Sequence, residues 1–200
     1  DGAGSTTGAV VLSQNQVAQL DLTAAPWEVA TTFNLTLDPD SLVVPSAVEL
    51  TPEGRYALIS IESQSDLYAL DLIDRSINLI ELAGLPSDLA VSDEPARTVV
   101  TYTSVPEVEV FDHERFEVES YGLDESMNQI REGDGQVVLF STLGFKDAYR
   151  LDLSSGDLVE YRLENPAVTL HMAPTQEFAV ALTRPEGGQG AYDTSPLLEV

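Results

Sequence analysis

The stretch from Pro45 to Leu82, PSAVELTPEGRYALISIESQSDLYALDLIDRSINLIEL, decides the fold of this chain. It contains the short apolar runs AVEL, YALISI, LYALDL and INLIEL, separated by turn-forming residues. Apolar runs this short and this closely spaced leave no room for a helix between them. The stretch therefore predicts four consecutive antiparallel strands.

The same layout recurs along the chain with a fixed period. The residues that open each repeat lie 41, 39 and 41 positions apart, at Ser46, Ser87, Ser126 and Ala167. An aspartate after an apolar residue recurs at intervals of 41 and 40, at Asp71, Asp112 and Asp152. Two independent sets of anchors give one period, and four strands in about 40 residues are typical of a β-propeller blade.

The second strands of the repeats support this interpretation. They read RYALIS, RTVVTY, QVVLFS and EFAVAL, which are nearly continuous apolar runs. Such runs are typical of strands that are covered on both faces, as the middle strands of a blade are by the two neighbouring blades. We therefore expect an all-β fold, a β-propeller of four-stranded antiparallel blades.

The repeat also predicts the organisation of the chain. Residues 1–8 read as a flexible tether, and residues 9–200 as a propeller segment with blades at 9–37, 46–82, 87–122, 126–163 and 167–200. The first blade lacks a first strand and the last is incomplete, so we expect part of a larger propeller of about seven blades. In the last blade, AYD at Asp193 and LLEV at Leu197 to Val200 compete as the third strand, and LLEV is preferred for its apolar character.

Composition excludes several functions. Thirty-four acidic residues against nine basic ones give a net charge of −25, which repels nucleic acid. A hydrated acidic surface is the preferred reading of this charge, and binding of divalent cations or of a basic partner is the alternative. There is no cysteine, so disulfides and zinc–thiolate sites are excluded, and no apolar run is long enough to predict a membrane span.

Two local motifs carry a family resemblance. The turn TPEG at Thr51 to Gly54 and the hairpin LDLSSG resemble bacterial YVTN-type and lactonase-like β-propeller repeats. The resemblance covers nearly the whole chain and implies the fold. It does not choose a function, because similar proteins include sugar lactonases, quinoprotein subunits and surface proteins that only bind.

Candidate site residues fall into two groups. Polar residues of the first strands are expected to line the central channel of the propeller, at Glu49, Asp88, Arg131 and His171. Periodic aspartates are expected to accept backbone N–H bonds at the outer turns, at Asp21, Asp71, Asp112 and Asp152, because a residue present in each blade solves a structural problem. The other histidine, His113, is expected in an exposed turn.

Metal ligands are sparse. The candidate calcium sets pair Asp38 with Asp40, Glu132 with Asp134, and Asp112 with Glu114. None has EF-hand spacing, and calcium takes six to eight oxygen ligands. No cofactor is predicted, and calcium is kept as an alternative.

Two functions remain open at this point. The preferred one is a non-enzymatic propeller that binds a protein or acts as a scaffold outside the cytoplasm, in the periplasm, at the cell surface or secreted. Its partner would be another protein, the remaining propeller blades or a second copy of the chain. The alternative is a lactonase-like or quinoprotein-like enzyme with its site at the central channel.

Overall fold

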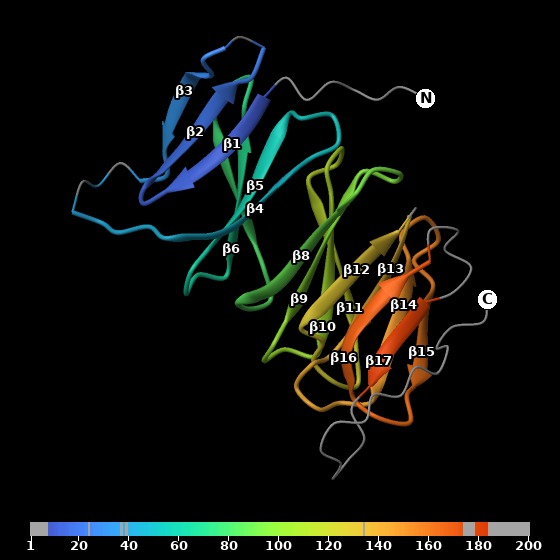
Figure 1. Ribbon diagram of the computed structural model, residues 1–200. Coiled ribbons are helices and arrows are strands. Elements are labelled where there is room, and N and C mark those ends of the chain that lie inside the picture. Colours follow the sequence, from blue (N-terminus) through green and yellow to red (C-terminus); the bar gives the residue numbers. More distant parts are fainter. Residues whose placement is uncertain are drawn as a thin grey trace. The chain divides into compact units, whose positions relative to one another are not determined.

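The computed structural model describes residues 8–23, 25–36, 38, 40–133, 135–173 and 179–183 (Figure 1). The regular elements of these residues are all β-strands. Within them there is no helix long and apolar enough to cross a membrane. Of the tether expected at residues 1–8, residues 1–7 lie outside the described residues and Gly8 begins the first strand. The choice between Asp193 and LLEV also lies outside the described residues.

The strands form antiparallel sheets in two compact parts of the chain, residues 1–81 and 82–200. The first part holds two sheets. The first sheet has the order β1 (Gly8–Ser13), β2 (Gln16–Asp21) and β3 (Glu28–Asn34). The second sheet has the order β4 (Pro45–Leu50), β5 (Tyr56–Ile61), β6 (Asp66–Asp71) and β7 (Ile77–Glu81).

The second part holds three sheets. The third sheet consists of β8 (Pro86–Ser92), β9 (Arg97–Tyr102), β10 (Glu107–Asp112) and β11 (Glu117–Gly122). The fourth sheet consists of β12 (Gln129–Gly133), β13 (Gln136–Phe140), β14 (Asp147–Asp152) and β15 (Leu158–Arg162). The fifth pairs β16 (Ala167–Met172) with β17 (Ala179–Thr183). The predicted all-β fold of four-stranded antiparallel sheets is confirmed.

The middle strands are buried because the sheets stack face to face. In β5, Ala57 and Ile59 pack into a core with Val17 and Phe33 of the first sheet. A second core joins the third sheet to the fourth, and a third core joins the fourth to the fifth. Removal of these apolar side chains from water is the main stabilising contribution, and it requires a neighbour for each sheet.

The first strands of the sheets in residues 82–200 lie side by side. In Figure 1, β12 runs between β8 and β16, and it contacts both. Polar side chains on these strands are therefore brought close to the backbone of the next sheet. A single continuous propeller over residues 9–200 and its number of blades stay predictions.

One turn glycine provides a test of how tightly neighbouring sheets approach. Gly135, between β12 and β13, has a φ of 79°, and a Cβ there would lie 2.6 Å from the carbonyl oxygen of Glu94. Gly54, between β4 and β5, has a φ of 66° but nothing within 4 Å of its Cβ position. We expect Gly54→Ala to lower the free energy of unfolding by about 1 kcal/mol, the cost of the left-handed conformation alone.

Gly135→Ala should cost at least about twice as much, because backbone must also move. Urea unfolding of the two variants checks this. Equal losses would mean that the contact between Gly135 and Glu94 is not close in the folded protein.

Candidate functional site

The periodic aspartates lie at the ends of the third strands and hold the turns that follow. In the second, third and fourth sheets, one carboxylate oxygen accepts the backbone N–H groups two and three residues further on. The donors lie 2.8 Å from Asp71, 3.0 Å from Asp112, and 2.9 and 3.0 Å from Asp152. Asp21 accepts the N–H of Thr23 in the same way, at 2.8 Å. This is the Asx-type bonding that favours aspartate in turns.

The turns after Asp71, Asp112 and Asp152 then close through a residue in the left-handed conformation. That residue is the fourth after the aspartate: Arg75, Phe116 or Gly156, with φ of 61°, 57° and 77°. Its N–H donates to the carbonyl oxygen of the aspartate, at 2.9, 2.9 and 2.8 Å. The same geometry recurs with three different residues at the left-handed position, so the aspartate is the shared determinant.

Asp71 is the most enclosed of the four aspartates, with 2% of its surface exposed. Burial alone would raise its pKa, but the N–H groups of Asp74 and Ile73 and the guanidinium of Arg55 together hold the pKa below its usual range. The Nε of Arg55 donates to the second carboxylate oxygen at 2.9 Å. The ionised form of Asp71 is therefore part of the folded structure.

We predict that Asp71→Asn lowers the free energy of unfolding by about 2 kcal/mol, because bonds to a charged acceptor are stronger than those to an amide. Asp21→Asn is the matched control, since Asp21 is exposed and its carboxylate bonds only to Thr23 among the described residues. It should have a measurably smaller effect in urea unfolding. Equal effects would show that burial and Arg55 add nothing at position 71.

The pKa shifts also predict a pH dependence. The pKa values of Asp71, Asp112 and Asp152 are all lowered in the folded state. Their contribution is complete above the unfolded pKa of about 4 and is lost as the pH falls through the lowered values. The difference in unfolding free energy between wild type and Asp71→Asn should be constant from pH 7 to about 5 and shrink below about pH 4. A difference independent of pH would contradict this assignment.

The expectation that His113 is exposed is wrong. Its side chain is buried, its Nε2 lies 2.7 Å from Oγ1 of Thr98, and its ring packs against Phe111 at 5.6 Å. His113 follows Asp112 directly, the position that Leu72 and Leu153 occupy in the neighbouring repeats. Alignment of that position could have revealed the burial, because leucine there is an apolar core residue in the fourth sheet.

Two of the four channel candidates connect one sheet to the next. The carboxylate of Asp88 in β8 accepts the N–H of Ile130 in β12, at 2.8 Å. The Nε of Arg131 in β12 donates to the carbonyl oxygen of Leu170 in β16, at 3.2 Å. The guanidinium of Arg131 also lies over the ring of Phe140. Both charges are therefore used in linking adjacent first strands.

The other two candidates, Glu49 in β4 and His171 in β16, have exposed side chains. Glu49 belongs to the other compact part of the chain, so its position relative to the remaining three is not described. That these four residues line a channel stays a prediction.

Two of the calcium-binding candidates, Asp38 and Asp112, use a carboxylate oxygen to accept a backbone N–H group within a turn. Asp38 accepts the N–H of Asp40 at 3.0 Å, and Asp112 accepts that of Glu114. Glu132 is exposed in β12, and Asp134 lies outside the described residues. Among the residues that the structure describes, no three His, Cys, Asp or Glu side chains are grouped to hold a metal ion. Calcium binding stays a prediction.

Sequence reasoning missed a hydrogen-bonded cluster around the buried carboxylate of Glu109 in β10. The carboxylate accepts hydrogen bonds from the hydroxyl groups of Tyr102 and Ser120 and from the N–H of Ala83. Burial and the adjacent carboxylate raise the pKa of Tyr102. Glu109 occupies the position that Tyr68 and Tyr149 occupy in the neighbouring repeats. A charged residue in a strand that is covered on both faces is the sequence signal that could have revealed this cluster.

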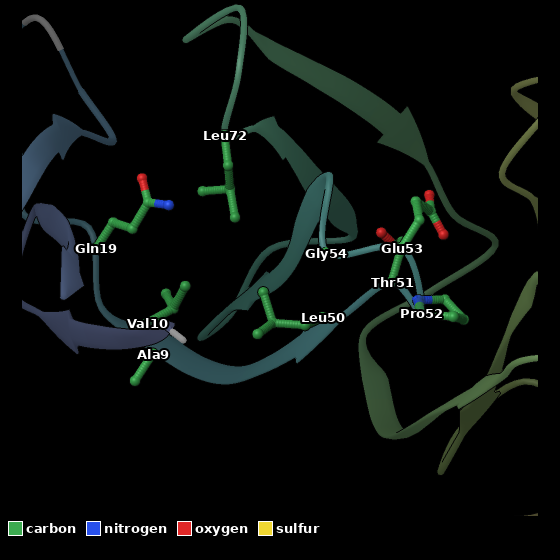
Figure 2. Close-up of a pocket in the computed structure, with 10 residues that line it drawn as sticks. Ala9, Val10, Gln19, Leu50, Thr51, Pro52, Glu53, Gly54 and Leu72 are labelled. Atoms are coloured by element: carbon green, nitrogen blue, oxygen red, sulfur yellow. The ribbon is translucent and has the colours of Figure 1, made fainter. Parts of the chain in front are cut away.

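A groove lies between the first and second sheets. It has a volume of about 550 Å³ and is lined by Gly8, Ala9, Val10 and Gln19 of the first sheet and by Leu50, Leu72 and residues 51–54 of the second. Figure 2 shows Val10, Leu50 and Leu72 directing apolar side chains toward one another. Glu53, on the turn that precedes β5, supplies a carboxylate at the same groove.

Comparison with solved structures identifies the architecture. Kuenenia stuttgartiensis hydrazine synthase matches with a TM-score of 0.66 at 17% identity, over 92% of this chain and 55% of that one. NirN, a dihydro-heme d1 dehydrogenase in complex with DHE, matches with a TM-score of 0.65 at 14% identity, over 88% and 40%. U3-55K matches with a TM-score of 0.63 at 10% identity, over 88% and 55%. The chain has the β-propeller fold.

At these sequence identities, the similarity to solved propeller structures shows the fold alone. Two of these neighbours, hydrazine synthase and the dihydro-heme d1 dehydrogenase NirN, are named as enzymes, and the name U3-55K states no activity. This propeller chain spans about half the length of the solved chains it matches. No family model and no curated protein matches it.

Proposed function

We propose that this propeller is a non-enzymatic module that binds another protein, and that it works outside the cytoplasm. The observation that carries the proposal is an exposed apolar face on the first sheet, here called the outer face. Its members alternate with the core residues of the same strands: they are the exposed Val11 and Val29 and the half-buried Ala18 and Leu20.

The register assigns these residues to the side away from the second sheet. Val10, Leu12 and Val17 belong to the core that the first sheet shares with Ala57 and Ile59. Side chains alternate along a strand, so Val11 lies on the opposite face. Leu20 pairs directly with Val29 and thus extends that face to β3.

The repeat provides an internal standard for this face. Gly8 pairs with Asp21 as Tyr56 pairs with Asp71, so Val11 corresponds to Ile59. Ile59 is 0% exposed because the first sheet covers it, whereas Val11 is 47% exposed and Val29 60%. Burial of a valine side chain contributes about 1.5–3 kcal/mol, so a partner protein or further propeller blades that cover this face would be substantially stabilised by it.

Charged first-strand residues support the non-enzymatic side of the proposal. Asp88 and Arg131 bond to the backbone of adjacent sheets, which gives them a structural task. The net charge of −25 supports an extracytoplasmic location, since it keeps a binding module well hydrated and opposes non-specific association. Fractionation of the native host tests the location.

Site-specific photo-cross-linking tests the binding face. A photoreactive residue at position 11 or 29 should give one defined protein adduct in the native host, because both side chains would lie in the interface. Position 73 is the matched control, since Ile73 is 72% exposed at a turn that follows β6, away from the outer face. Val11→Lys should abolish the adduct at position 29.

Equal labelling at positions 11, 29 and 73 would contradict a specific binding face. Hydrolysis of a lactone by the purified chain, lost in His171→Gln, would instead favour the enzyme alternative. Metal analysis of the same preparation tests for bound calcium.

A further inference from the structure

The connection between the two compact parts of the chain is bound by a side chain of the third sheet. It consists of residues 82–85, which lie between β7 and β8 and belong to residues 82–200. The N–H of Ala83 donates to a carboxylate oxygen of Glu109 in β10, at 3.0 Å. A residue 26 positions further along the chain therefore fixes the backbone of the connection.

The carboxylate of Glu109 is buried and surrounded by hydrogen-bond donors. Only 6% of Glu109 is exposed, and its oxygens also accept the hydroxyl of Ser120, at 3.2 Å, and the hydroxyl of the fully buried Tyr102. A carboxylate away from water is stable only where donors replace its hydration shell. The backbone amide of Ala83 is one of these donors, so the connection and the buried charge stabilise each other.

The next residue of the connection packs closely against the same sheet. A Cβ at Gly84 would lie 2.8 Å from Cγ2 of Val105 and 3.6 Å from Cδ1 of Tyr102. Carbon atoms cannot approach to 2.8 Å unless one of them shifts. The connection is therefore held at two consecutive residues, by a hydrogen bond at Ala83 and by close packing at Gly84.

The fourth sheet contains an uncharged counterpart of this arrangement. Tyr149 occupies there the position of Glu109, and its hydroxyl accepts the N–H of Asp124 at 3.1 Å. Asp124 lies one repeat, 41 residues, after Ala83. One position of the repeat thus binds two successive connections, by a carboxylate in the third sheet and by a hydroxyl in the fourth.

The two acceptors differ in strength and in location. A hydrogen bond to a carboxylate is about twice as strong as one to a neutral oxygen, and a low-dielectric interior strengthens it further. The carboxylate binds the connection at which the chain passes from residues 1–81 to residues 82–200, whereas the hydroxyl binds a connection inside residues 82–200. The stronger acceptor is therefore found at the boundary between the two parts.

We propose that Glu109 and Tyr102 form a latch that holds residues 83–85 on the third sheet, and that opening of this latch turns the connection into a flexible joint. Glu109 is a positioning residue in this device, and the hydroxyl groups of Tyr102 and Ser120 orient its carboxylate. The inference is independent of the proposed binding function, because the latch residues belong neither to the outer face nor to the groove.

Residue-resolved hydrogen exchange on the whole 200-residue chain tests the latch. Glu109→Gln keeps the size of the side chain and an acceptor oxygen but removes the charge, so the amide of Ala83 should exchange about fivefold faster. Tyr149→Phe is the matched control, since it removes the acceptor at the same repeat position. It should speed the exchange of Asp124 and leave that of Ala83 unchanged.

Spin labelling tests the flexible joint. The chain has no cysteine, so a single label can be attached through Leu85→Cys, where the native side chain is 52% exposed. Glu109→Gln should make this label more mobile, which sharpens its EPR lines. A label at Leu143→Cys is the control, because Leu143 is 54% exposed in the loop between β13 and β14, and its spectrum should not change.

Gly84→Ala perturbs the connection without altering the carboxylate. The added methyl group would push the connection away from Val105, so exchange at Ala83 should again be faster. Unchanged exchange at Ala83 in both Glu109→Gln and Gly84→Ala would overturn the proposal. Equal acceleration of Ala83 and of Val99, a core residue of β9, would also overturn it, because the amides would then exchange by global unfolding and not by local opening.

Discussion

A strand that is apolar on both faces must be covered on both faces, and the rest of the structure depends on this constraint. Ala57, Leu58 and Ile59 follow one another in β5, and all three are fully buried. No single sheet can satisfy such a strand, so each sheet needs a neighbour on either side. In residues 1–81, the outer face of the first sheet does not meet this requirement, because Val11 and Val29 are exposed there.

Charged side chains set how adjacent sheets align in residues 82–200. Arg97 of β9 donates to the carbonyl oxygen of Leu153 at 2.6 Å, in addition to the bonds of Asp88 to Ile130 and of Arg131 to Leu170. Apolar packing between sheets is non-directional, whereas these bonds are directional. Three charges directed at backbone groups of the following sheet thus favour one alignment over others with similar burial.

The repeat could be predicted because strand length, apolar runs and turn residues are local properties of the sequence. The burial of His113 and the cluster at Glu109 could not be predicted in the same way. Both depend on which side chains meet across strands: His113 meets Thr98, and Glu109 meets Tyr102. Likewise, the bond from Ile130 to Asp88 follows from sheet stacking, which spacing along the chain does not reveal.

The aspartate turns have an evolutionary consequence. Asp71, Asp112 and Asp152 hold their turns through backbone N–H groups, so the identities of the next residues matter little to the turn. The residues that follow are LIDR, HERF and LSSG, which differ in charge and in size. Substitutions at the tips can therefore accumulate without shifting the fourth strand, because its pairing is set by the aspartate. This freedom applies to the second and third residues after the aspartate, since the first is buried at His113 and Leu153 and the fourth adopts a left-handed conformation.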